Sequence, residues 1–227
     1  MLTPPEILPR EGSHLIHLLF RVEYSQWEAF DQPERFAAKT SLAKLVQEIR
    51  STPGTQLLLF SIVTPKADIG FILLTPDLQV ADAFSKRLAL ALGPDLLSPV
   101  FTWLSLTTSS DPDLPDWPLV CLYPVSKRRT PGQNWYELAA ADRQSLMAEE
   151  ARLTAPYAGR VLEMLTASTG LDDGEEFVTL FAQSSSDIQA LIREKQFGAA
   201  SARYTECGAF FIGLQLPLDV IYRRLSL

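Results

Sequence analysis

Histidine is almost absent from this chain of 227 residues. The two that exist, His14 and His17, lie near the N-terminus in the stretch HLIHLLF. A metal site made of several imidazoles therefore cannot be built, and a Ser-His-Asp triad would have to use one of these two side chains. The apolar residues around them are typical of a β-strand, so we expect both histidines to have structural positions.

Cysteine and long apolar runs are also scarce. Cys121 and Cys207 are the only cysteines, which favours two reduced thiols over a disulfide framework. No apolar run approaches the roughly 18 residues of a transmembrane helix, so no membrane insertion is expected. The first residues, MLTPPEILPREGSH, lack the apolar core of a secretory signal, and we expect a cytoplasmic protein.

The chain has no excess of positive charge. Its 20 Lys and Arg residues against 27 Asp and Glu residues give a net charge of −7. A general nucleic-acid-binding protein would need a basic surface, so this class is not expected. A local cluster of Lys and Arg can still form a pocket for an anionic small molecule.

Strand and helix patterns alternate twice along the chain. In the first half, the order β-α-β-β-α-β is predicted by apolar runs and helical spacing over residues 13–24, 33–51, 56–63, 70–74, 77–92 and 99–106. A similar order follows in the second half, over residues 117–124, 134–165 (a helix with a break near Pro156), 176–182, 186–194 and 207–216. One strand of the repeat is hard to identify there.

This order predicts an α+β protein with two ferredoxin-like (split βαβ) repeats, which together form a dimeric α+β barrel-type domain. We expect an N-terminal half over residues 1–107 and a C-terminal half over residues 118–227. The polar, proline-containing residues 108–117 would connect them.

The motif YPVSKRR indicates a candidate binding site. Tyr123 lies at the end of a predicted strand, and Lys127, Arg128 and Arg129 follow in the next loop. A phenol and three cations at a strand end could bind a ligand that carries carboxylates or phosphates. A solvated basic loop beside a core tyrosine is the alternative interpretation, and the motif alone does not decide between them.

Together with the later blocks NWYEL, DRQSLM, YAGR, TGLDDGEEFVTLF and ASARYTECGAFFIG, this motif resembles the chlorite dismutase and coproheme decarboxylase family over residues 123–213. The resemblance is strongest to the coproheme decarboxylase branch. It implies two ferredoxin-like units, a homopentamer and a porphyrin pocket in the second half. It also implies a function in haem biosynthesis, the peroxide-dependent oxidative decarboxylation of iron-coproporphyrin, with haem or coproheme as the bound group.

The resemblance also implies roles for three side chains. Tyr123 matches the tyrosine that is oxidised to a radical and attacks the propionates, and Lys127 matches the lysine that assists at a propionate. These two are the candidate catalytic residues. Trp135 matches an aromatic side chain beside the porphyrin.

The chain departs from the family at the iron. Glu150 stands where the family has the histidine that ligates the iron, and Glu163 stands at a distal-side position. The arginine that the family places upstream of the tyrosine has no match in TTSSDPD. A carboxylate is not a usual haem ligand, and two carboxylates in one apolar pocket need a cationic partner. Arg152 and Arg160 are the candidates for that partner.

Two sulfur atoms are further candidates. Met147 precedes Glu150 by three residues and shares its helix face, so its thioether could in principle reach an iron, but we expect a core position for it instead. Cys121 precedes Tyr123 by two residues and shares its strand face, and we interpret it as a buried structural thiol.

Two hypotheses follow. In the first, the protein is a coproheme decarboxylase-like enzyme in which Glu150, or no side chain, ligates the iron. In the second, it is a non-catalytic family member that binds a metal-free porphyrin or another anionic small molecule, or acts as an interaction subunit in an oligomer.

Overall fold

The computed structural model describes residues 6–108 and 113–227. The chain divides into two compact units. The first ends at Asp116 and is completed by Gly213–Leu227, and the second is Trp117–Ile212. The sequence-based division kept all of residues 118–227 together. The last residues join the first unit instead, because Ile221 and Tyr222 are buried in its core.

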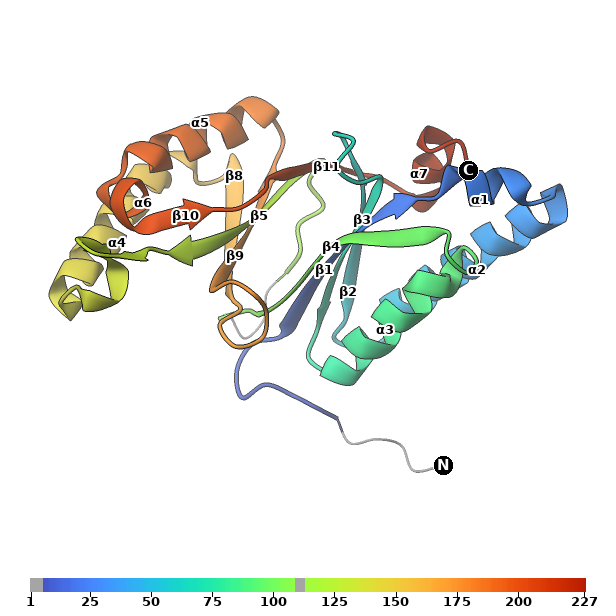
Figure 1. The fold of residues 1–227 in the computed structure, drawn as a ribbon, viewed down its shortest axis with the longest axis horizontal. Helices are drawn as coiled ribbons and strands as arrows, with labels where there is room; N and C mark the ends of the chain where they lie inside the picture. Colours follow the sequence, from blue (N-terminus) through green and yellow to red (C-terminus); the bar gives the residue numbers. More distant parts are fainter. Residues whose placement is uncertain (1–5, 109–112) are drawn as a thin grey trace. The chain divides into compact units, whose positions relative to one another are not determined.

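The first unit has the predicted order β-α-β-β-α-β (Figure 1). Its elements are β1 (His14–Val22), α1 (Tyr24–Ala29), α2 (Gln32–Arg50), β2 (Gln56–Ile62), β3 (Ile69–Thr75), α3 (Leu78–Ala91), β4 (Leu97–Leu106) and the C-terminal α7 (Leu218–Arg224). The strands form an antiparallel sheet in the order β2-β3-β1-β4. The end of β11 (Phe211–Gln215) pairs with β2 through Gly213–Gln215.

Local sequence explains the two long helices of this unit. α2 begins with a capping box, in which the Asp31 and Glu34 side chains each accept a hydrogen bond from the other residue's backbone N–H. It ends just before Pro53, which interrupts a helix, and Gly54, whose φ of +68° lies outside the right-handed helical region. α2 and α3 pack on the sheet through apolar side chains such as Leu42 of α2.

The strand position of the two histidines is confirmed. Both lie in β1, where His14 is 6% and His17 0% exposed. Burial lowers the pKa of His17 to about 3, so this imidazole is neutral at physiological pH.

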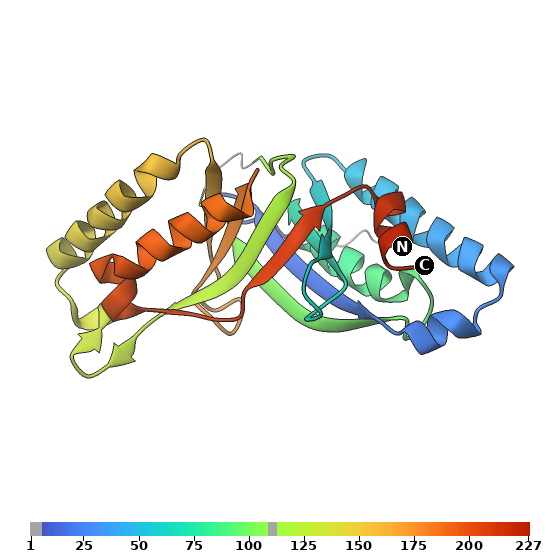
Figure 2. The same cartoon turned by 90° about the horizontal axis from the view of Figure 1, so that it is seen from above.

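The second unit has a related order around its own antiparallel strands, which pair in the order β10-β5-β9-β8 (Figure 2). Its elements are β5 (Leu119–Lys127), β6 (Arg129–Thr130), β7 (Gln133–Asn134), the 3-10 helix η1 (Trp135–Glu137), α4 (Ala140–Thr154), the 3-10 helix η2 (Ala155–Tyr157), β8 (Val161–Ala167), β9 (Glu176–Ala182), α5 (Ser185–Phe197), α6 (Ala199–Tyr204) and β10 (Thr205–Cys207). α4 and α5 contact each other beside this sheet.

The prediction of one interrupted helix over residues 134–165 is wrong. α4 ends at Thr154, and the chain then turns through Pro156 and through Gly159, whose φ of +80° favours glycine. Residues after this turn form β8, which pairs along its length with β9. β8 is the strand that was hard to identify, and it places Glu163 on a strand rather than on a helix.

Two further expectations concern the cysteines and membrane insertion. Cys121 and Cys207 are free cysteines, as expected. Over the described ranges 6–108 and 113–227, no helix is both long enough and apolar enough to cross a membrane.

Candidate functional site

A cavity of about 1050 Å³ lies within the second unit. Strands β5, β8, β9 and β10 and helices α4, α5 and α6 all contribute to its walls. All six side chains predicted as site residues line this cavity: Tyr123, Lys127, Trp135, Met147, Glu150 and Glu163. The structure therefore brings the whole predicted set together, although its members come from four different elements.

Tyr123 is held in the sheet wall by packing. Its side chain is 3% exposed, and its ring stacks on Phe210 with 4.4 Å between ring centroids. Burial, followed by the nearby Glu163 carboxylate, raises the pKa of the phenol above its ordinary value, so Tyr123 stays protonated at neutral pH. Cys121 on the same strand is fully buried, and burial raises the pKa of its thiol to about 12. This agrees with a structural thiol.

Lys127 reaches the cavity at the end of β5. Its Nζ lies 3.2 Å from a carboxylate oxygen of Glu176 and 5.2 Å from the centroid of the Trp135 ring. Trp135 is almost buried, and its ring tilts against Tyr204 at 5.9 Å. The cation and the indole thus form one corner of the cavity.

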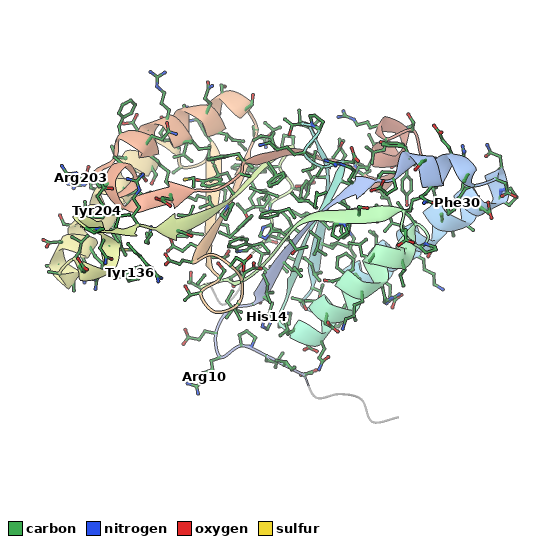
Figure 3. The ribbon with its side chains drawn as sticks, in the orientation of Figure 1. Arg10, His14, Phe30, Tyr136, Arg203 and Tyr204 are labelled. Carbon is green, nitrogen blue, oxygen red and sulfur yellow. The ribbon has the colours of Figure 1, made fainter. Side chains whose placement is uncertain are left out.

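The next two cations also have acidic partners. Arg128 lines the cavity, and its Nε lies 3.3 Å from Glu206. Arg129 pairs with Glu175 at 2.6 Å and lies over the ring of Tyr136 at 4.8 Å. In Figure 3, Tyr136 lies at the same end of the unit as Arg203 and Tyr204. The loop is therefore not simply solvated, because two of its three cations line the cavity.

One face of α4 forms a wall of the cavity. Met147, Glu150, Ala151 and Thr154 line it at positions i, i+3, i+4 and i+7, which is the spacing of a single helix face. α4 is described over its whole length, and none of its side chains is buried. Met147 is 61% exposed, so the expected core position for this side chain is wrong.

Lys195 of α5 holds the two carboxylates that were predicted to face the porphyrin. Its Nζ lies 3.3 Å from Glu150 Oε1 and forms a second, shorter ion pair with Glu163 Oε1. Burial on its own would lower the pKa of Lys195, but the two carboxylates outweigh it and raise the pKa above its ordinary value. The ammonium is therefore charged at neutral pH.

The prediction that Arg152 or Arg160 is the cationic partner of these two carboxylates is wrong. The Arg152 side chain donates to a backbone carbonyl of its own helix, and Arg160 pairs with Asp187 at 2.9 Å. The Arg160 guanidinium also donates to the backbone carbonyl of Pro156, so its known partners are Asp187 and Pro156 and neither of the two glutamates.

Sequence reasoning missed Lys195, although a signal was present. Ile188, Leu191, Ile192 and Lys195 are spaced i, i+3, i+4 and i+7, so a lysine extends the apolar face of a predicted helix. The first two of these side chains are buried in the core of the unit. A cation on such a face requires an acidic partner nearby.

The cavity has apolar walls but no usual protein ligand for a haem iron. Leu165, Val178, Ile192 and Phe210 supply apolar wall. Both histidines of the chain belong to the first unit, and the Glu150 carboxylate is engaged by Lys195. Cys207 also lines the cavity, but burial raises the pKa of its thiol. Among the described residues, no cluster of three or more His, Cys, Asp or Glu side chains could hold a metal ion.

Comparison with known proteins gives a consistent result. A family model described as chlorite dismutase matches residues 35–216. A solved structure described as a novel heme-binding protein from Thermus thermophilus is 28% identical, with full coverage of both chains and a TM-score of 0.90. Chlorite dismutase from Candidatus Nitrospira defluvii in complex with imidazole is 18% identical, covers 96% of this chain and 97% of its own, and has a TM-score of 0.81. The latter similarity concerns the fold alone.

Proposed function

The chain belongs to the chlorite dismutase family, and we propose that it binds a porphyrin in the cavity of its second unit without a protein ligand to a central iron. The observation that carries this proposal is the ion pair between Lys195 and Glu150, the residue that the resemblance assigns to the family's iron-ligand position. The 28% identical relative is described as heme-binding, which supports a porphyrin as the ligand class.

The size and composition of the cavity support the same ligand class. Small-molecule pockets commonly have volumes of about 300–1000 Å³ and apolar walls with a few placed polar groups. This cavity, at about 1050 Å³, lies just above that range, as a large ligand requires. The open face of α4 is a surface that a large flat ligand would cover.

Two cations are suited to the carboxylate substituents of a porphyrin. Lys127 and Arg128 line the cavity and are paired with Glu176 and Glu206. A propionate would have to share or replace these acidic partners. We therefore expect the apolar walls, more than new ion pairs, to supply most of the binding free energy.

Peroxide-dependent decarboxylation of iron-coproporphyrin is the second candidate function. It is favoured by the presence of Tyr123 and Lys127 at the same cavity. The iron-ligand position does not support it, because the residue there is a carboxylate already paired with a lysine. The homopentamer and the cytoplasmic location also remain predictions, and light scattering of the purified protein would test the first.

Porphyrin titrations test the main proposal. Metal-free and ferric coproporphyrin are added to the protein, and binding is followed by the Soret band. Ala151→Trp, which fills the cavity from α4, should weaken binding at least about tenfold, because ligand and indole would compete for one space. Ala148→Trp is the matched control, since Ala148 is an exposed α4 residue that does not line the cavity.

Two outcomes would count against the proposal. The first is no saturable binding of either porphyrin to the unmodified protein. The second is equal weakening of porphyrin binding by both tryptophan variants.

For the second candidate function, peroxide is added to the ferric complex and the pigment is analysed by mass spectrometry. If the pigment loses carboxylate groups with the wild-type protein but not with Tyr123→Phe, decarboxylation is supported. An unchanged pigment with the wild-type protein would oppose it.

A further inference from the structure

Lys195 has a position that suggests a specific role within the cavity. Three elements meet at its ammonium group: α5 supplies the lysine, α4 supplies Glu150 and β8 supplies Glu163. The side chains of all three are 15–25% exposed and line the cavity, so the cluster is a part of the ligand site and not of the outer surface.

From this arrangement we propose that Lys195 makes the cavity selective for metal-free porphyrin over ferric porphyrin. The inference rests on the proposed function, because it concerns the ligand class of the same cavity. The side chain acts as an internal cation that occupies the two carboxylates which a metal ion would otherwise use.

Competition between cations is the first reason. Carboxylates are hard ligands that suit ferric iron, so Glu150 and Glu163 could approach an iron if they were free. In the structure both contact the same ammonium. Ligation by Glu150 would break its ion pair with Lys195 inside the cavity, and this loss offsets part of the gain from an iron–carboxylate bond.

Charge balance is the second reason. A ferric porphyrin brings a positive charge to its centre, whereas the centre of a metal-free porphyrin is neutral. Lys195 neutralises one of the two carboxylate charges, so the cluster attracts a ferric centre less strongly than Glu150 and Glu163 would on their own. Ser201, whose Oγ lies 3.5 Å from Glu150 Oε1, adds no charge to the cluster.

Hydrogen bonding is the third reason. The core of a metal-free porphyrin has both N–H donors and nitrogen lone pairs. An ammonium is a donor and a carboxylate is an acceptor, so the lysine–glutamate cluster can donate to and accept from a neutral core of this kind while it keeps its ion pairs. A ferric core has no N–H group to donate.

The test is the ratio of two dissociation constants measured on the same protein. Metal-free and ferric coproporphyrin share the same carboxylate substituents, so the ratio isolates the effect of the metal. The wild-type protein should bind the metal-free form at least about tenfold more tightly. In Lys195→Met, the ferric form should gain at least about tenfold relative to the metal-free form, because its charge replaces the lost ammonium.

Two control variants accompany this test. Lys195→Arg keeps the charge and should keep the wild-type preference. Lys86→Met removes an exposed lysine of the first unit that pairs with Asp82, and it should also leave the ratio unchanged. A general loss of folding would weaken the binding of both porphyrins and leave their ratio unaffected.

The possible failures are distinguishable. If no variant binds any porphyrin, the proposed function is wrong and the selectivity inference fails with it. If the wild-type protein binds ferric coproporphyrin as tightly as the metal-free form, the role of Lys195 is overturned while porphyrin binding stands. The role of Lys195 is also overturned if Lys195→Met leaves the ratio of the two dissociation constants at its wild-type value. If Lys195→Met does not fold, the wild-type ratio alone tests the selectivity.

Discussion

A single lysine changes the interpretation of two glutamates. Glu150 and Glu163 could be regarded as costly carboxylates in an apolar pocket, but each contacts Lys195. An ion pair of this kind satisfies charges that would otherwise be unfavourable on burial. The chemistry of the cavity therefore depends on three side chains together, and substitution at one of them changes the environment of the other two.

Glu150→His should create an iron ligand. The imidazole would stand on the α4 face that lines the cavity, and Lys195 would keep its ion pair with Glu163. Because imidazole is a usual axial ligand of haem iron, ferric coproporphyrin should bind at least about tenfold more tightly, with a shifted Soret band.

Glu149→His is the control for this change. Glu149 is the neighbouring residue on α4 but does not line the cavity, so its substitution should leave the ferric spectrum unchanged. Equal spectra for the two variants would contradict the placement of Glu150 at the ligand site.

Acid should destabilise the protein partly through His17. Its folded-state pKa is about 3 because burial disfavours the imidazolium, whereas its ordinary value is 6.5. A lowered histidine pKa contributes stability that is present above 6.5 and is lost as the pH falls below it. Between about pH 7.5 and pH 5, His17 should account for a loss of about 2 kcal/mol in the free energy of unfolding.

Denaturant titrations of the wild-type protein and of His17→Gln over this pH range check the expectation. The variant should show the smaller decrease, because glutamine takes up no proton. Parallel pH profiles for the two proteins would show that His17 is not buried in its neutral form.

Among the helices, α4 has an unusual environment. A helix of this kind normally obtains most of its stability from an apolar face packed on the core. α4, described throughout, has no buried side chain, and one of its faces lines the cavity. The helix is therefore the element whose packing a ligand would complete.

Hydrogen exchange should report this coupling. Saturation with metal-free coproporphyrin should slow amide exchange in Ala140–Thr154 at least about tenfold, because a ligand that covers the inner face opposes local opening. Exchange in α2, which already buries five side chains, should not change. Unaltered α4 exchange at saturation would place the ligand elsewhere.

At the scale of the whole molecule, the first unit is built from two separate segments of the chain, one before and one after the second unit. The segment Gly213–Leu227 returns to the first unit, where Ile221 is fully buried. The N-terminal core thus includes side chains from the last residues of the chain, and its stability depends on them.

Ile221→Ala should lower the free energy of unfolding by about 2–4 kcal/mol, because it leaves a cavity in the core of the first unit. Arg224→Ala, at an exposed position of the same helix, should change it by less than about 0.5 kcal/mol. Denaturant unfolding measures both. The porphyrin affinity of folded Ile221→Ala should equal that of the wild type, and a large loss would mean that the ligand site depends on the first core.

Local patterns in the chain were sufficient for the order of most strands and helices and for the strand position of His14. The resemblance to the family was sufficient to select six side chains that all line one cavity. Such predictions succeed because apolar periodicity and short motifs depend on residues that are close together in the chain. Strand β8 was missed because VLEML also fits a continuation of the preceding helix, and its pairing with β9 is a contact between separate segments.

Tertiary structure alone decided which cation serves the two glutamates. Arg152 and Arg160 are nearer to them in the chain, but Lys195 is the residue whose ammonium reaches both carboxylates. The physical reason is that an ion pair depends on distance in space, and here the packing of the second unit brings one residue each from α4, β8 and α5 to the same place. The same packing made a cavity from residues that the chain holds far apart, and with it the ligand selectivity that we propose.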